Sequence, residues 1–182
     1  LGELELKTGS RQPAIELFDR AILLDPTNPI SFRLRGQAHW GQRDHAKERL
    51  AAIRDFTHSL ELQPDQPELL VQRAQAYLKS NQPLSALADF EQALTQNDLQ
   101  ANAYSGRASI LVTQQKHEYA LIWLTKAIHR FSQPVDLAEI LFARGCVYLE
   151  MGRYIPAIND FKQVMKLMSE SPTTVAAARN AR

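Results

Sequence analysis

Small and apolar residues recur on one helical face at intervals along the chain. In the clearest case, Ala86, Phe90 and Ala93 are four and then three residues apart, which places them on one stripe of a helix. The leading alanines of five such stripes are residues 14, 52, 86, 120 and 157, so the intervals between them are 38, 34, 34 and 37 residues. A self-similar period near ~34 residues is typical of a helical solenoid. The other stripes are Ala14, Phe18, Ala21; Ala52, Phe56, Ser59; Ala120, Leu124, Ala127; and Ala157, Phe161, Val164.

Each stripe is predicted on the second helix of a hairpin whose first helix carries a small residue near its middle. Residues 1–7 read as the end of a first helix, and the stripe helix that follows is expected to stop before Asp25. Second helices are then expected near 45–62, 83–96, 117–131 and 154–168. First helices are expected near 29–41, 67–79, 101–114 and 137–151, with Gly36, Ala74, Ala108 and Gly145 as their small residues.

Two insertions interrupt the period. The first adds four residues, close to one helical turn, and we expect it to lengthen a helix at 44–48 with Asp44 as the N-cap. The second adds three residues within 132–136, which we interpret as a longer connection between helices.

The order of small, aromatic and alanine positions resembles the tetratricopeptide repeat. The third unit carries it as Ala74, Tyr77, Ala86, Phe90 and Ala93, although Asp98 replaces the proline that closes a typical unit. The resemblance implies an all-α, right-handed superhelical solenoid of antiparallel helix hairpins spanning 1–182. Its repeats are expected near 1–28, 29–66, 67–100, 101–137 and 138–171, with 172–182 beginning a further or capping helix.

A charged pair recurs in register with the stripes. Arg35, Arg73, Arg107 and Arg144 each precede the small residue of a first helix, and Asp55, Asp89 and Asp160 each precede the stripe Phe. We interpret these residues as structural ion pairs between the two helices of a hairpin, in preference to a row of arginines that binds an acidic partner. In the fourth unit Trp123 takes the Asp position, so Arg107 requires another arrangement.

The resemblance also implies a binding surface. In this family the first helices line a concave face that binds an extended peptide or a partner helix, and we expect this chain to act as a scaffold for protein or peptide. A subset of the family holds a C-terminal carboxylate with basic residues, but Asn102 and Gly106 stand where such residues belong, so that mode is not expected. The expected lining residues are Arg33, Gln37, Trp40, Glu68, Val71, Gln75, Lys79, Asn102, Ser105, Ser109 and Phe142.

A second contact surface is expected where the stripe helix of the fourth unit is apolar on too many faces. Residues 119–124 read Tyr-Ala-Leu-Ile-Trp-Leu, and a helix that is apolar all round is normally covered. Either the connection at 132–136 folds over Ile122 and Trp123, or a second molecule does.

Composition bears on the remaining classes of function. The chain has 182 residues with 21 Lys and Arg against 20 Asp and Glu, so a basic nucleic-acid-binding face is not expected. Its five histidines are scattered, its one cysteine, Cys146, falls on a packed helix, and no apolar run is long enough to cross a membrane. We therefore predict no enzymatic activity, no metal and no cofactor.

Two alternatives to a peptide scaffold stay open. Leu1 and Arg182 both interrupt helical patterns, which suggests an excised segment and therefore a regulatory or targeting arm of a larger enzyme. The other alternative is a homo-oligomerisation module that self-associates through the open ends of the solenoid or the Trp123 region.

Overall fold

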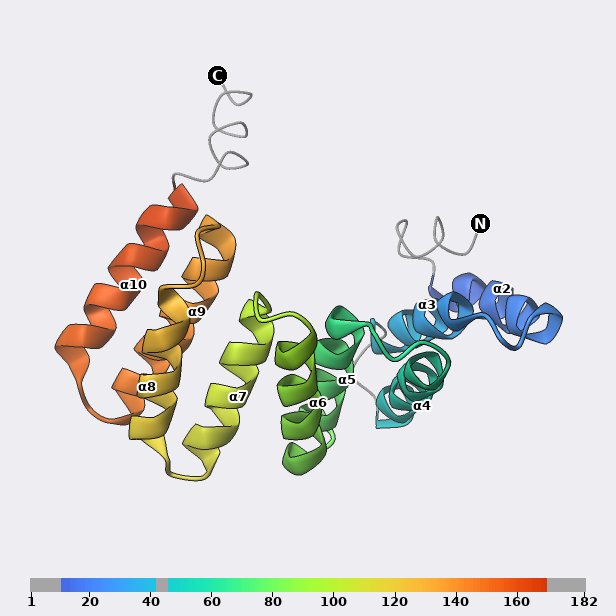
Figure 1. The fold of residues 1–182 in the computed structure, drawn as a ribbon, viewed down its shortest axis with the longest axis horizontal. Coiled ribbons are helices and arrows are strands. Elements are labelled where there is room, and N and C mark those ends of the chain that lie inside the picture. The colour runs from blue at the N-terminus through green and yellow to red at the C-terminus, as the bar shows by residue number, and fades with distance from the viewer. Residues whose placement is uncertain (1–10, 42–45, 170–182) are drawn as a thin grey trace, which may run out of the picture. The chain divides into compact units, whose positions relative to one another are not determined.

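The fold of the protein, a computed structural model, is described for residues 11–41 and 46–169. This part of the chain holds nine α-helices and no strand (Figure 1). The helices are α2 (Arg11–Leu24), α3 (Pro29–Trp40), α4 (Ala46–Leu62), α5 (Pro67–Lys79), α6 (Pro83–Gln96), α7 (Ala101–Thr113), α8 (His117–Ile128), α9 (Pro134–Glu150) and α10 (Tyr154–Ser169).

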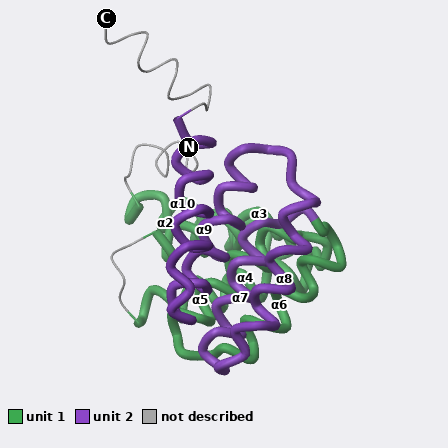
Figure 2. The backbone as a smooth tube through the Cα atoms, turned by 90° about the vertical axis from the view of Figure 1, so that its left-hand side faces the viewer, with its two compact units in different colours: residues 1–98 green, residues 99–182 purple. Residues whose placement is uncertain are grey.

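The helices pair in sequence as hairpins, as the repeat pattern predicted. The pairs are α3 with α4, α5 with α6, α7 with α8, and α9 with α10. The chain forms two compact units, residues 1–98 and residues 99–182, which Figure 2 draws in green and purple. In unit 1, α2 also packs on α3 and α4 on α5, while in unit 2 α9 packs on both α7 and α8. The leading Ala of all five stripes is fully buried.

One expectation about the connections is wrong. The residues inserted within 132–136 were expected to lengthen a loop, but α9 begins at Pro134, so three of them form its first turn. Proline suits the first position of a helix because an N–H at that position would have no partner within the helix. The negative charge of Asp136 in the same turn interacts favourably with the positive end of the helix dipole. The expectations for residues 1–7, Asp44 and 172–182 lie outside the described residues.

Close approach of the two helices in a hairpin depends on small residues in the first helix. A Cβ atom built on Gly36 would lie 2.6 Å from the Phe56 ring, and one built on Gly145 would lie 2.6 Å from the Phe161 ring. Real Cβ atoms do not come that close to a ring, so the stripe Phe occupies the space that a side chain would need.

The predicted ion pairs are confirmed in three hairpins. Arg73 donates from Nε and Nη2 to the two carboxylate oxygens of Asp89, at 2.8 and 2.7 Å. Arg35 makes the same bidentate pair with Asp55, and Arg144 makes it with Asp160. All three aspartates are buried, and the hydrogen bond and negative charge of its partner raise the pKa of each arginine against the opposing effect of burial.

The third nitrogen of each arginine reaches the preceding stripe helix. Arg35 donates from Nη1 to Asp19, which follows Phe18 on α2, at 2.7 Å. Arg73 and Arg144 donate in the same way to the hydroxyls of Thr57 on α4 and Thr125 on α8. Each guanidinium therefore joins three helices, and so connects one hairpin to the helix before it.

We call the three Arg–Asp ion pairs the ion-pair ladder. Removing one member of such a pair should destabilise the unit that contains it. We expect Asp89→Asn to lower the free energy of unfolding by about 3 kcal/mol, because a largely buried guanidinium loses its counter-charge. Asp65→Asn, at an exposed position in the same unit, should change it by no more than about 0.5 kcal/mol. Urea unfolding followed by circular dichroism measures both, and equal midpoints for the two variants would contradict the structural role.

Candidate protein-binding surfaces

In unit 1, side chains from α3 and α5 meet across the gap between the two first helices. Gln37 donates from Nε2 to Oε1 of Gln72 at 3.1 Å, and the Nζ atom of Lys79 lies 4.8 Å from the centre of the Trp40 ring. An ammonium group over an indole face is attracted by about 0.5–1 kcal/mol at exposed sites. These contacts hold Trp40 in place. We call the exposed and half-buried residues among those predicted on α3 and α5, together with Gln72, the first-helix face of unit 1.

The remaining predicted residues of this face differ in how much they expose. Glu68 is exposed, while Arg33 and Gln75 are half-buried. The Nε atom of Arg33 is buried and has no hydrogen-bond partner among the described residues. The expectation for Val71 is wrong, because only 4 % of its surface is exposed. Leu69, Leu70 and Val71 are buried in succession, so this turn of α5 is covered on more than one side and Val71 belongs to the core.

In unit 2, the packed first helices α7 and α9 enclose a groove of about 250 Å³. Ser105 and Ser109, both predicted binding residues, lie on its α7 wall. We call this groove and the predicted residues around it the first-helix face of unit 2. The groove is lined by Ser105, Ala108, Ser109, Val112 and Thr113 from α7 and by Ala143, Cys146, Val147 and Glu150 from α9.

A carboxylate on α9 lies beside Ser105. Glu139 on α9 accepts a hydrogen bond from Ser105 Oγ at 2.7 Å. With its amide turned so that Nδ2 faces the carboxylate, the predicted residue Asn102 donates to both oxygens of Glu139, at 2.6 and 2.9 Å. Burial and the negative charge of Asp136 raise the pKa of Glu139, while the Ser105 hydrogen bond opposes the shift.

Phe142 and Cys146 follow Glu139 along α9. The side chain of Phe142 is 55 % exposed, and its ring lies 5.7 Å from that of Phe161 on α10, so it stands at the edge of this face. Burial and the charge of Glu150 raise the pKa of the Cys146 thiol. The thiol is therefore less reactive than an ordinary one, which argues against a nucleophile here.

The two residues of the predicted second contact surface on α8 differ in exposure, since Trp123 is half-buried and Ile122 is exposed. The Trp123 ring lies 5.1 Å from the Tyr104 ring, and the guanidinium carbon of Arg107 lies 4.0 Å from its centre, so α7 covers part of the half-buried Trp123. Ile122 is 54 % exposed. It lines an open groove of about 380 Å³ together with Trp123 and Tyr119. The cation–π contact between Arg107 and Trp123 therefore occupies the position at which three other hairpins have an Arg–Asp ion pair.

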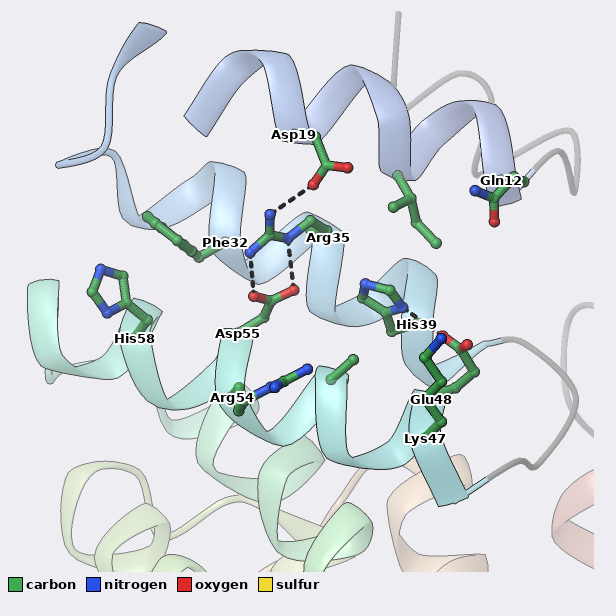
Figure 3. Close-up of a pocket in the computed structure, with 12 residues that line it drawn as sticks. Gln12, Asp19, Phe32, Arg35, His39, Lys47, Glu48, Arg54, Asp55 and His58 are labelled. Atoms are coloured by element: carbon green, nitrogen blue, oxygen red, sulfur yellow. Dashed lines mark hydrogen bonds and ion pairs between the residues drawn. The ribbon is translucent and has the colours of Figure 1, made fainter. Parts of the chain in front are cut away.

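A further cavity is one that the sequence did not predict. It measures about 630 Å³, lies between α2 and α4 over α3, and has Arg35 at its floor (Figure 3). Its charges are largely paired within the protein, because Arg35 bridges Asp19 and Asp55, and His39 lies 2.6 Å from Glu48. We call it the ladder cavity, and interpret it as a consequence of the ion-pair ladder.

The described residues place no three His, Cys, Asp or Glu side chains where they could hold a metal ion. In the same ranges, no helix is both long enough and apolar enough to cross a membrane.

Comparison with known families decides the class of protein. Two models of the tetratricopeptide repeat match the chain, one over residues 1–67 and 71–133 and the other over residues 138–168. The chain belongs to the tetratricopeptide repeat family. A comparison with the sequences of curated proteins finds no match. Members of the family generally mediate protein–protein interactions and generally act as non-enzymatic scaffolds.

Solved structures of tetratricopeptide repeat proteins share the fold. MamA from Desulfovibrio magneticus RS-1 is 18% identical with a TM-score of 0.76, over 94% of this chain and 93% of that chain. TTC0263 from Thermus thermophilus is 18% identical with a TM-score of 0.69, over 100% and 95%. YrrB, described as having an unusual peptide-binding site, is 15% identical with a TM-score of 0.69, over 98% and 88%. At these identities the likeness establishes the solenoid fold alone.

The raised pKa of Glu139 gives a test of its surroundings. A group whose pKa is raised by folding stabilises the fold while it is protonated, and this stability is lost as the pH rises through that pKa. We therefore expect Glu139→Gln to be more stable than the wild type at pH 7, with a difference that shrinks as the pH falls to about 4. Thermal unfolding across this range measures it.

The control is Glu118→Gln, which removes an exposed carboxylate of the same unit from α8. It should change the stability by no more than about 0.5 kcal/mol at either pH. A Glu139→Gln variant that is less stable than the wild type at pH 7 would show that the charged carboxylate stabilises the fold.

Proposed function

We propose that this tetratricopeptide repeat chain is a scaffold that binds a peptide or protein segment on its first-helix faces. The observation that supports the proposal most directly is the contact between successive first helices in unit 1. Gln37 with Gln72, and Trp40 with Lys79, bring hydrogen-bonding and aromatic groups from two repeats onto one surface. An extended segment lying across both helices would meet these groups in turn.

Each anchor has a defined role in this proposal. Trp40 offers an indole face for stacking, and its contact with Lys79 limits the rotamer freedom that binding would otherwise remove. Gln37 and Arg33 supply donors for backbone carbonyls or a carboxylate of the segment. Aromatic and arginine side chains are the residue types most often found at interface hot spots.

A displayed library of random peptides tests this proposal. Peptides selected on the wild type should bind the Arg33→Ala, Trp40→Ala double variant at least about tenfold more weakly, because truncating a hot spot costs about 2 kcal/mol or more. The matched control is Lys47→Ala, Arg54→Ala, which alters two residues of the ladder cavity and should leave affinity unchanged. Selected peptides that bind the first double variant as tightly as the wild type would remove unit 1 from the proposed site.

A second candidate function, self-association, is favoured by α8. Ile122 and Tyr119 are exposed side by side with Trp123 in an open groove, and apolar surface of this kind marks contact sites. The partner in this proposal is a second copy of the chain. It would cover the apolar face of α8, which the sequence predicts to be covered.

Light scattering across a dilution series tests self-association. The wild type should show a mass that rises toward twice the monomer value with concentration, and Ile122→Ser should lower that rise because it removes apolar contact area. Ile155→Ser, at an exposed isoleucine on α10, should leave it unchanged. A monomer at every concentration would exclude this function.

A further inference from the structure

Within the part of the chain that the structure describes, the groove between α7 and α9 is lined by acidic, apolar and neutral polar residues and by no cationic one. Glu150 lies at one end of the groove. Near the other end Ser105 is hydrogen bonded to Glu139, with Asp136 one turn earlier on α9. In unit 1, by contrast, Lys79 and Arg33 bring positive charge to the first-helix face.

The separation of the two carboxylates sets a length for the occupant. Glu139 and Glu150 are eleven residues apart on one helix, which corresponds to about 16 Å at about 1.5 Å per residue. An extended peptide covers about 3.3–3.6 Å per residue, so about five residues span the same distance.

The middle of the groove is apolar and narrow. Val112 on α7 and Ala143 and Val147 on α9 line it. Its volume of about 250 Å³ falls below the roughly 300–1,000 Å³ of pockets that enclose a drug-sized molecule. The groove therefore suits the side chains of a peptide better than a whole small-molecule ligand.

Glu139 favours a cationic group at its end of the groove. Its hydrogen-bond donors, Ser105 and Asn102, are neutral, and the charge that raises its pKa is the negative one of Asp136. Among residues 11–41 and 46–169, no Lys or Arg side chain forms an ion pair with the half-buried Glu139, whereas Arg144 pairs with Asp160 in the same unit. An ammonium or guanidinium from a partner would supply the counter-charge.

We infer that the groove between α7 and α9 binds an extended peptide segment with Lys or Arg side chains about five residues apart and small aliphatic residues between them. One cation pairs with Glu139 and Asp136, the other pairs with Glu150, and the aliphatic residues contact Val112 and Val147. The inference rests on the proposed function and adds to it the chemistry of the segment that unit 2 selects.

Fluorescence anisotropy with labelled synthetic peptides tests the inference. The probe peptide has two lysines five positions apart, separated by alternating Ala and Val. The first comparison peptide has glutamine at both lysine positions and the second has glutamate. We expect the wild type to bind the lysine peptide at least about tenfold more tightly than the glutamine peptide. The reason is that a charge-assisted hydrogen bond contributes more binding free energy than a neutral one. The glutamate peptide should bind most weakly.

Variants of the protein locate the contact. Glu139→Gln and Glu150→Gln should each weaken the lysine peptide about tenfold, leaving the glutamine peptide nearly unchanged. The matched control is Glu118→Gln, which removes one negative charge from unit 2 at a position on α8 outside the groove. It should leave the affinity for all three peptides unchanged, and circular dichroism confirms that each variant is folded.

Two results would overturn the inference. The first is that the lysine peptide binds the wild type no more tightly than the glutamine peptide does. The second is that the lysine peptide binds the Glu139→Gln, Glu150→Gln double variant as tightly as it binds the wild type. Library-selected peptides distinguish this failure from failure of the proposed function. If they still lose affinity for the Arg33→Ala, Trp40→Ala variant, the scaffold function stands and only the cationic specificity is wrong. If no peptide from the library depends on either first-helix face, the proposed function itself fails.

Discussion

In two of the hairpins, α3–α4 and α9–α10, a phenyl ring packed against a glycine sets the position of the two helices. Gly36 faces Phe56, and Gly145 faces Phe161, at distances that leave no room for a Cβ atom. Because Arg35 precedes Gly36 and Asp55 precedes Phe56 in the chain, the same register that seats the ring also brings the guanidinium onto the carboxylate. Apolar packing and charge pairing are therefore one constraint, and neither can change register without the other.

That constraint also determines which residues of the first helices stay available. Arg35 and Gly36 are committed to the second helix, and Gln37 and Trp40 lie on another stripe of α3 because residues three apart share a face. Those two residues meet Gln72 and Lys79 on α5, the next first helix. The ion pairs on one side of α3 thus leave a surface of polar and aromatic groups on the other.

Periodicity was enough to predict the helices and the ladder, because both follow from residues that repeat in register. The errors arose where one residue departs from the repeat. Pro134 could be read as a loop signal or as the first residue of a helix, and only the structure shows that it begins α9. Val71 falls on the predicted binding surface of α5 but is buried, as are Leu69 and Leu70 beside it. The residues after Phe18 and Phe56, Asp19 and Thr57, were a missed signal, since each accepts the third hydrogen bond of an arginine.

The fourth unit shows how far the ladder can vary. Trp123 replaces the aspartate, and Arg107 lies over its ring where the other arginines make ion pairs. A cation–π contact with the Trp123 ring takes the place of the contact with an aspartate, and the hairpin α7–α8 is kept. The exchange removes a negative charge from the ladder side of unit 2, whereas Asp136, Glu139 and Glu150 keep theirs on α9. A partner of the first-helix face of unit 2 would meet these three carboxylates, so its charge must complement theirs.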